Sequence, residues 1–347
     1  MKALVTGATG FVGSHVAKQL VDAGHEVTIL RRGNSPLGNV EGLPVRHAIG
    51  DLSDETALRE AVRGQDTVFH VAALYVLWAP KSQTFFDTNV EGTRRMLRVA
   101  ADAGARRIVY TSTMGTVHGC RRGDVADETR EFNLAATRDP YILSKRAAED
   151  AALELARAGA PIVVVNPAGP IGPGDIKPTP TGDLVVRFVN GQLPGYTDGG
   201  FNFVDVRDVA RGHLLAAEKG RVGERYILGG HNLSILELMQ ALARATGLRP
   251  PPLKVPHAVA FAMASLLELV AAIIRRPPLM TRANVRTLRY YLHVSSEKAL
   301  RELGYRPGPL EPAIRDAVAW FHAQGKLKPR RMRRVLEHWN QAPQLPT

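Results

Sequence analysis

Tyr141 and Lys145 are the pair whose types and spacing most directly suggest chemistry, because they stand four positions apart in Tyr-Ile-Leu-Ser-Lys. On a helix this spacing puts both side chains on one face. A free phenol has a pKa near ~10, and a neighbouring ammonium group favours the phenolate and lowers that pKa. We therefore predict that Tyr141 exchanges a proton near neutral pH and that Lys145 tunes it.

A run of hydroxyl side chains follows a short apolar stretch. Arg107–Thr111 is expected to be a strand, and Ser112 and Thr113 come directly after it. Open α/β sheets bind ligands at the carboxyl ends of their strands, where a hydroxyl can hold a substrate oxygen against the Tyr141 phenol. Taken singly, a Tyr/Lys pair at this spacing can also be ordinary helix surface, and a run of hydroxyl residues can simply end a strand. Their order along the chain favours the catalytic interpretation.

A glycine-rich turn joins the first predicted strand, Lys2–Thr6, to the first predicted helix, Gly13–Ala23. Glycines here permit a tight turn, close approach of the backbone to a pyrophosphate, and close packing of helix on strand. The free N–H groups of the helix start then face the phosphates. Lys145 is placed to hydrogen-bond the nicotinamide ribose. We assign the turn to dinucleotide binding through Gly7, Thr9, Gly10, Phe11, Val12 and Gly13.

The 2′ position of the adenosine ribose is usually recognised at the end of the second strand, by an acidic side chain in NAD-binding proteins. This chain has Arg31 and Arg32 there, after the predicted strand Glu26–Leu30. Guanidinium groups suit a 2′-phosphate. We therefore predict that NADP is preferred over NAD, the alternative being two surface arginines at a strand end.

Strands that are apolar throughout alternate with helices in the first half of the chain. A sheet covered on both faces gives this pattern, so we predict an α/β fold with a Rossmann-type doubly wound parallel sheet and a smaller C-terminal substrate lobe. The further elements expected are strands at Val45–Ile49, Thr67–Val71 and Ile162–Asn166 and helices at Glu55–Val62 and Val90–Ala103.

The pattern changes at a Pro- and Gly-rich segment that begins at Pro167. We expect a dinucleotide-binding domain over 1–166, with 203–228 returning to it, and a mostly substrate-binding lobe over 167–325. A basic tail over 326–347 is interpreted as a solvated appendage, with a membrane or polyanion contact as the alternative.

His257–Ile274 is almost continuously apolar and carries Glu268 well inside it. A charge at the centre of a spanning helix costs about 2.5–3.5 kcal/mol, so we favour a buried helix of the small lobe. In-plane membrane contact through 257–276 is the second interpretation.

Composition is that of a folded globular protein, with 45% hydrophobic and 22% charged residues. The single cysteine, Cys120, and the absence of a zinc-type Cys/His spacing predict no metal site and fit a reducing cytoplasm. The opening residues resemble a buried strand more than a signal peptide. The net charge of +12 suits a phosphorylated ligand or the anionic inner face of a membrane, and we expect no nucleic-acid partner.

Together these motifs resemble the extended short-chain dehydrogenase/reductases, in the NAD-dependent epimerase/dehydratase and dihydroflavonol-4-reductase-like branch. The resemblance runs from Met1 to about Ala323. The stretches 70–80 and 166–182 look most like the hopanoid-associated sugar epimerase family. The arginines at 31 and 32 depart from NAD-using epimerases and resemble the reductase side of the branch.

The resemblance implies roles for further residues. Asp51 and Leu52 are expected at the adenine, Ala72 and Ala73 along the cofactor, Asn89 as a structural and active-site asparagine, and Pro167 and Gly169 beside the nicotinamide. The family's usual serine corresponds to Thr113 here, with Ser112 in reserve. The candidate substrate contacts are Ser112, Tyr75, Trp78, His118 and Tyr196.

The expected activity is hydride transfer to or from a carbinol or ketone, either as a sugar epimerase or as an NADPH-dependent carbonyl reductase. Candidate substrates are a nucleotide sugar, or a hopanoid-linked polyol or ketone. A non-catalytic dinucleotide sensor, or a membrane- or RNA-binding protein on the same fold, is the alternative of another class. A homodimer is what the resemblance implies for assembly.

Overall fold

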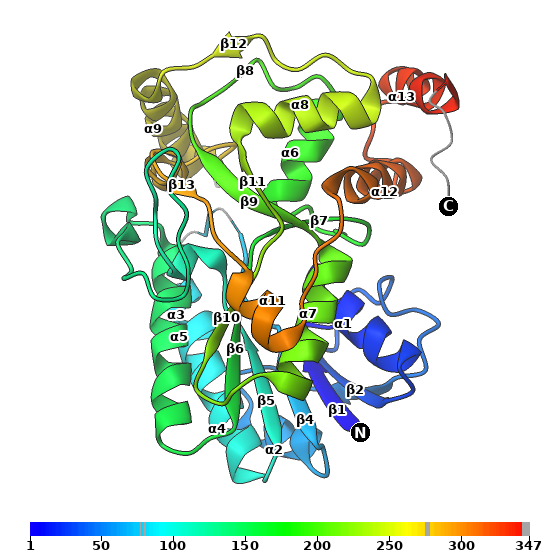
Figure 1. The fold of residues 1–347 in the computed structure, drawn as a ribbon, viewed down its shortest axis with the longest axis vertical. Helices are drawn as coiled ribbons and strands as arrows, with labels where there is room; N and C mark the ends of the chain where they lie inside the picture. The colour runs from blue at the N-terminus through cyan, green and yellow to red at the C-terminus, as the bar shows by residue number, and fades with distance from the viewer. Residues whose placement is uncertain (77, 80, 275–277, 342–347) are drawn as a thin grey trace.

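A seven-stranded parallel sheet forms the centre of the larger domain (Figure 1). The computed structural model describes residues 1–76, 78–79, 81–274 and 278–341. The strand order β10-β6-β5-β4-β1-β2-β3 reverses between β1 and β4, the kind of switch point at which doubly wound sheets bind dinucleotides. The strands are β1 (Lys2–Thr6), β2 (Glu26–Arg31), β3 (Arg46–Ile49), β4 (Thr67–His70), β5 (Arg107–Thr111), β6 (Ile162–Pro167) and β10 (Arg225–Leu228).

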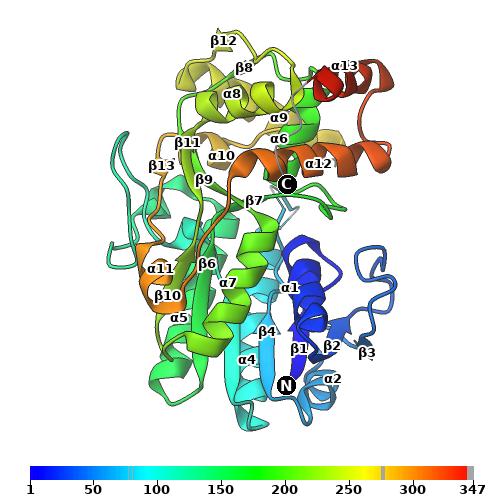
Figure 2. The same cartoon turned by 45° about the vertical axis from the view of Figure 1, so that its right-hand side comes forward.

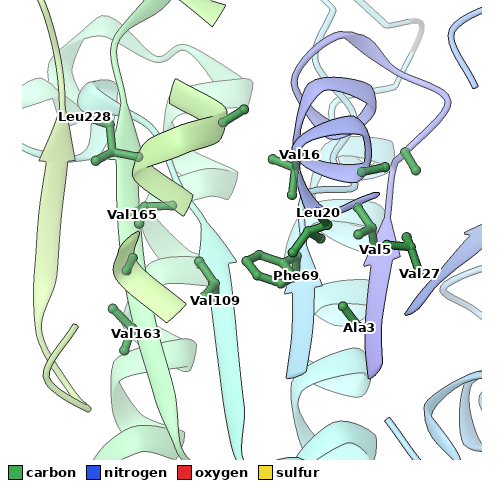
Figure 3. Close-up of a cluster of buried hydrophobic side chains, with 14 of the residues drawn as sticks. Ala3, Val5, Val16, Leu20, Val27, Phe69, Val109, Val163, Val165 and Leu228 are labelled. Carbon is green, nitrogen blue, oxygen red and sulfur yellow. The ribbon is translucent and has the colours of Figure 1, made fainter. Parts of the chain in front are cut away.

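Helices cover both faces of this sheet, as its uniformly apolar strands predict. One face packs against α1 (Phe11–Asp22), α7 (Val206–Lys219) and α11 (Glu297–Leu303), and Figure 3 shows Val16 and Leu20 of α1 lying against Val5 and Phe69. The other face packs against α2 (Glu55–Val62), α4 (Thr93–Asp102) and α5 (Pro140–Arg157). Strand β6 is buried along its whole length, whereas the edge strand β3 is largely exposed.

The helix predicted to begin at Val90 begins earlier in the structure. A short helix α3 (Gln83–Phe86) continues through a π-helical segment η1 (Asp87–Gly92) into α4. A π-helical segment changes which residues point inward, and such segments are frequent at functional sites. The turn of η1 buries Asn89 completely.

A smaller lobe stands above the sheet in Figure 1. Strand β9 (Gly200–Asp205) pairs with β7 (Gly169–Ile171), β11 (His231–Ser234) and β13 (Tyr291–Leu292). The lobe core packs β9 against α6 (Pro180–Val189), α8 (Ile235–Thr246) and α12 (Leu310–Ala323). The segment 203–228 is divided, because β9 lies in the lobe while α7 and β10 lie against or within the large sheet. The remaining elements are η2 (Met114–Thr116), η3 (Leu134–Thr137), β8 (Gly195–Tyr196), β12 (Leu253–Lys254), α9 (His257–Ile274), α10 (Arg282–Thr287) and α13 (Pro329–Gln341).

The expectation that His257–Ile274 is a buried helix is wrong. The segment does form α9, but only Ala260, Ala264 and Ala271 of its 18 residues are buried. By length and composition α9 would suffice to cross a membrane. Ala260 and Ala264 pack with Phe261 against Val285 of α10, whereas most of the large apolar side chains of α9 are exposed. Arg275, Arg276 and Pro277, which follow it, lie outside the described residues.

The interpretation of 326–347 as a solvated appendage is also wrong over its described part. Residues 329–341 form α13, whose Met332 and Val335 are buried in the lobe core. The Trp339 indole N–H donates to the carbonyl of Ala245 at 2.7 Å. Arg330, Arg333 and Arg334 are therefore exposed residues of a docked helix, which Figure 2 shows beside α12 and α8. Residues 342–347 lie outside the described residues.

Candidate active site

The turn between β1 and α1 has no room for side chains at its glycines. Gly7 has a φ of +73°, and a Cβ there would lie 2.8 Å from the backbone of Ala72, at the end of β4. A Cβ on Gly13 would lie 2.3 Å from the Gly7 carbonyl oxygen. Gly10, the N-cap residue of α1, provides no side-chain cap, so the first N–H groups of that helix face the turn, where Thr9, Phe11 and Val12 also lie. The bare backbone and the helix start together fit a dinucleotide pyrophosphate.

Asn39 fixes the position of this turn, which the sequence did not indicate. Its Nδ2 donates to the Gly174 carbonyl at 2.8 Å and lies 3.4 Å from that of Gly10. His15 of α1 contacts the neighbouring carbonyl of Pro173 at 2.8 Å. The loop after β7 is thereby held against the dinucleotide turn. Only the folded chain shows this, because 135 residues separate Asn39 from Gly174.

Two arginines stand at the end of β2, with different surroundings. The Arg31 Nε donates to His47 at 2.9 Å, and its Nη1 contacts the carbonyls of Arg32 and Gly33. Arg32 is exposed. Asp51 accepts two hydrogen bonds from Ser53, and the Leu52 carbonyl accepts one from Arg95 at 2.7 Å. The guanidinium of Arg32 is thus the one of the two with open space around it.

Asn89 clamps the loop that follows β4. Its Oδ1 accepts from the Leu74 N–H at 2.7 Å, and its Nδ2 contacts the Leu74 carbonyl at 3.2 Å and the Ser144 hydroxyl at 3.0 Å. The loop containing Ala72 and Ala73 is therefore tied to α5, which carries Tyr141. The N–H of Ala72 donates to the Thr6 hydroxyl at 3.2 Å.

The start of α5 places Tyr141 at a defined height above the sheet. Asp139 is the N-cap residue, and its carboxylate accepts the N–H of Tyr141 at 2.9 Å. Pro140 occupies the first helical position, which needs no N–H donor. Lys145 follows one turn later, and its ammonium donates to the Thr111 carbonyl at 2.6 Å, at the end of β5. It also lies 4.7 Å from the ring centre of Tyr110.

Thr113 and Ser112 have different partners. The Thr113 hydroxyl lowers the pKa of the Tyr141 phenol, because it lies beside that phenol and favours the phenolate. Thr113 is partly exposed and also caps η2. The Ser112 hydroxyl is buried and lies 3.3 Å from the Thr116 hydroxyl. The structure brings Thr113, rather than Ser112, to the phenol.

Burial controls the proton affinities of the pair. It raises the pKa of Tyr141 above its ordinary value, despite the neighbouring Thr113 hydroxyl. Burial also lowers the pKa of Lys145 to about 7, while the negative charge of Glu149 raises it. The predicted lowering of the Tyr141 pKa is thus not found in the chain by itself, because burial outweighs the effect of Thr113 and the negative charge of Asp139 raises this pKa further.

Glu149, one further turn along α5, was not singled out from the sequence. It is fully buried, and its Oε1 accepts from Arg225 Nη1 of β10 at 2.8 Å. Its Oε2 accepts from the Thr116 hydroxyl at 2.7 Å and the Asn166 amide at 2.6 Å. This network ties α5, η2, β6 and β10 together beneath Lys145. The i, i+4 spacing from Lys145 was its only visible signal.

Tyr75 lies against the ring of Tyr141. Its ring centre is 4.6 Å from that of Tyr141, with the planes tilted by 37°. His118 is held within its own loop, with Nδ1 2.6 Å from the Glu131 carbonyl and Nε2 near Asn133 and Arg130. Tyr75 is therefore the aromatic candidate whose ring contacts the Tyr141 ring.

The other candidates lie on separate segments. Trp78 lies in the same post-β4 loop as Tyr75 and is partly buried. Tyr196 lies on β8, which pairs with β12 in the lobe. Pro167 ends β6, and Gly169 begins β7, where a Cβ would lie 3.2 Å from the Asn202 carbonyl. No cluster of metal-ligating side chains occurs among residues 1–76, 78–79, 81–274 and 278–341.

Comparison with known proteins gives one family. The family model described as the NAD dependent epimerase/dehydratase family matches residues 3–229. A dihydroflavonol 4-reductase-like protein of Synechocystis sp. is 39% identical over 93% of this chain and 95% of its own length. The sterol demethylase protein B of Methylococcus capsulatus is 34% identical over 94% of this chain and 100% of its own length.

Solved structures agree with this family over nearly the whole chain. A nucleoside-diphosphate-sugar epimerase from Pseudomonas aeruginosa is 28% identical, with a TM-score of 0.79 over 94% of this chain and 99% of its own. A double mutant of the dTDP-glucose 4,6-dehydratase DesIV from Streptomyces venezuelae, solved with NAD bound, is 26% identical. Its TM-score is 0.76 over 95% of this chain and 99% of its own.

Proposed function

The chain belongs to the NAD-dependent epimerase/dehydratase family, and we propose that it catalyses hydride transfer to or from a carbinol or ketone, with Tyr141 as the acid/base. The observation that carries this function is the placement of buried Lys145 one helical turn after Tyr141, with its ammonium on the Thr111 carbonyl at the carboxyl end of β5. The bound nicotinamide supplies the hydride acceptor or donor. Tyr141 gives or takes the proton on the substrate oxygen, and Thr113 holds that oxygen in place.

Lys145 and the dinucleotide turn have the supporting roles. The Lys145 ammonium is placed to hydrogen-bond the nicotinamide ribose and to favour the phenolate when the substrate oxygen needs a proton acceptor. The bare backbone of the Gly7–Gly13 turn and the start of α1 hold the pyrophosphate. Asp51, Leu52, Ala72, Ala73, Asn89, Pro167 and Gly169 complete the cofactor site, as in the family pattern.

NADP is the preferred cofactor in this assignment. Arg32 is exposed at the end of β2, where an acidic residue would otherwise accept the 2′-hydroxyl. The solved DesIV relative binds NAD, so the comparisons support a nicotinamide dinucleotide and leave the choice between the two to the arginines. Tighter binding of NADH than of NADPH would contradict this preference.

A carbonyl reductase and a sugar epimerase differ in how they use the cofactor. A reductase releases NADP after each turnover, whereas an epimerase retains the dinucleotide and returns the hydride to the opposite face of its substrate. The reductase-like relative and the arginines of β2 support the first. The stretches at 70–80 and 166–182 support the second, with a nucleotide sugar or a hopanoid-linked polyol as substrate. Nucleotide retained through purification supports epimerisation, and loss of NADPH absorbance with ketones supports reduction.

Tyr141→Phe tests the acid/base role itself. The variant removes the phenolic proton and keeps the ring, so turnover is expected to fall by about 10²–10⁴-fold while NADPH still binds. NADPH affinity measured by fluorescence titration separates this loss from a loss of cofactor binding. Unchanged turnover would remove Tyr141 from the chemistry. Affinity without any turnover in the wild-type chain would favour a dinucleotide sensor.

The same proposal includes a homodimer acting in the cytoplasm, with the segment 257–276 in peripheral contact with the inner face of a membrane. Light scattering measures the oligomeric state directly. The membrane contact depends on the exposed surface of α9.

A further inference from the structure

Helix α9 has an apolar stripe that the rest of the described chain leaves open. Leu266, Leu269 and Ile273 are 60%, 61% and 74% exposed. They recur at helical spacing of three and four and so share one face. Every exposed residue of α9 is Ala, Val, Met, Leu or Ile, and the stripe is completed by Val259, Met263, Val270 and Ile274.

Glu268 and Ser265 of α9 have partners within the protein, and His257 at its start is partly buried, with an Nδ1 that lacks a partner among the described residues. The Glu268 carboxylate accepts the N–H of Arg282 at 2.7 Å and also pairs with its guanidinium. The Ser265 hydroxyl donates to the Phe261 carbonyl at 2.9 Å. Nothing on the open face therefore needs water or a hydrogen-bond partner, and the whole stripe can enter a hydrocarbon phase without stranding a polar group.

The packing of α9 sets its orientation. Val285 of α10 packs on Ala260 and Ala264, near the start of α9, while Arg282 at the start of α10 pairs with Glu268. The two helices thus run along each other within one lobe, and a spanning α9 would have to break that packing. A helix held against its own protein on one side meets a bilayer side-on, with its apolar face at the boundary of headgroups and acyl chains.

The charges around α9 match an anionic surface. Positions 249–290 contain seven basic residues and one acidic residue, Glu268, which is already paired. Lys254, which also pairs with Asp198, and Arg289 are exposed. Both lie near the start of α9 and form its basic rim. A second copy related by twofold symmetry would place this basic rim against itself, which like charges disfavour. Anionic lipid headgroups attract such residues.

We propose that the open face of α9 docks on an anionic membrane, with the stripe in the acyl boundary and the basic rim on the headgroups. This surface is independent of the chemistry assigned to Tyr141. The surface and Tyr141 are connected through α10, which packs both on α9 and on η3, the segment shortly before α5.

Flotation with vesicles tests the surface directly. The full chain is mixed at low salt with vesicles of phosphatidylcholine containing about one third phosphatidylserine. We expect the wild type to float with these vesicles, and to bind pure phosphatidylcholine less. The triple variant Leu266→Gln, Leu269→Gln and Ile273→Gln is expected to lower the partition coefficient at least tenfold. Glutamine keeps helix propensity, and these side chains are exposed, so the fold is expected to persist.

A matched control changes three exposed apolar residues elsewhere, through Val125→Gln, Val222→Gln and Leu300→Gln. It is expected to float like the wild type. The thermal midpoint and NADPH binding report folding in both triple variants. Wild-type protein that stays unbound at low salt would overturn the proposal, as would equal binding by the α9 variant. A third outcome would also overturn it: a wild-type protein that is a dimer, does not bind vesicles, and becomes a monomer in the α9 variant. In that case a second copy of the chain, rather than a membrane, would cover the α9 stripe.

Discussion

Lys145 is a cation that the fold buries at a cost. Its ordinary pKa is near ~10.4, and burial lowers it to about 7 in the folded chain. Between these values the unfolded chain holds the extra proton, so the contribution of this group makes stability rise as pH increases from 7 toward 10. Below pH 7 both states are protonated, and the full cost of the buried charge is present. The role proposed for Lys145 in the reaction, rather than a contribution to stability, accounts for such a group.

Lys145→Met is therefore expected to raise the free energy of unfolding at pH 7, by about 2 kcal/mol after the lost hydrogen bond to Thr111 is allowed for. The advantage is expected to shrink toward pH 10, while turnover is lost at both. Urea denaturation of both proteins at the two pH values measures the difference in unfolding free energy. The ionisation of the other lysines contributes equally to both proteins and cancels in this difference. A variant less stable than wild type at pH 7, or a difference that ignores pH, would contradict the assignment.

Arg32 is expected to act on one phosphate only. Arg32→Ala removes an exposed guanidinium, so the structure itself loses no described hydrogen bond of that side chain. NADPH binding is expected to weaken by at least tenfold, because a charge-assisted contact to the 2′-phosphate is lost. NADH binding is expected to change less than twofold. Fluorescence titration with NADPH and NADH measures both affinities. Equal weakening of the two affinities would assign Arg32 a general electrostatic role.

At the scale of elements, the dinucleotide turn has the sharpest steric requirement. Gly13→Ala places a Cβ 2.3 Å from the Gly7 carbonyl oxygen, which is backbone and cannot swing away. We expect a loss of about 1–3 kcal/mol in stability and loss of dinucleotide binding. Gly24→Ala is the matched control at the other end of α1, where φ is +76° and the space is open. It is expected to cost about 1 kcal/mol and to leave binding intact; calorimetry with NADPH compares them.

The large sheet was predictable from the sequence because most of its strands are apolar along their length, as buried strands are. Lys2–Thr6, Arg107–Thr111 and the helix Glu55–Val62 have the predicted bounds, since an apolar run between turn signals needs no knowledge of distant residues. The same holds for Tyr141 and Lys145, which share one helix. The π-helical segment at Asp87–Gly92 carries no comparable local signal.

The unpredicted parts of the site depend on contacts between distant segments. Asn39 reaches Gly174, and Glu149 meets Arg225 of β10. A polar residue that will be buried by such a contact looks, in the sequence, like any surface residue. Thr113 was distinguished from Ser112 by resemblance, and the structure adds the physical reason: the neighbouring hydroxyl is buried against Thr116.

At the scale of the whole molecule, the C-terminal lobe reverses two local expectations in opposite directions. An apolar helix, α9, lies largely exposed, and a strongly basic segment, α13, is docked into the core. Composition could not distinguish these outcomes, because the same apolar run suits a core and a membrane surface. In α13 the arginines mask an apolar pair, Met332 and Val335, at a spacing of three that defines one helix face.

Docking of α13 makes a testable difference between two kinds of residue on one helix. Met332→Ala and Val335→Ala together remove buried side chains from the lobe core, so unfolding free energy is expected to fall by about 3 kcal/mol or more. Arg333→Ala and Arg334→Ala alter exposed positions of the same turns and are expected to change it by less than about 0.5 kcal/mol. Urea denaturation followed by tryptophan fluorescence reports on the lobe, because Trp320 and Trp339 both pack against its core. If both double variants matched the wild type, α13 would be a solvated appendage after all, and the lobe core would end at α12.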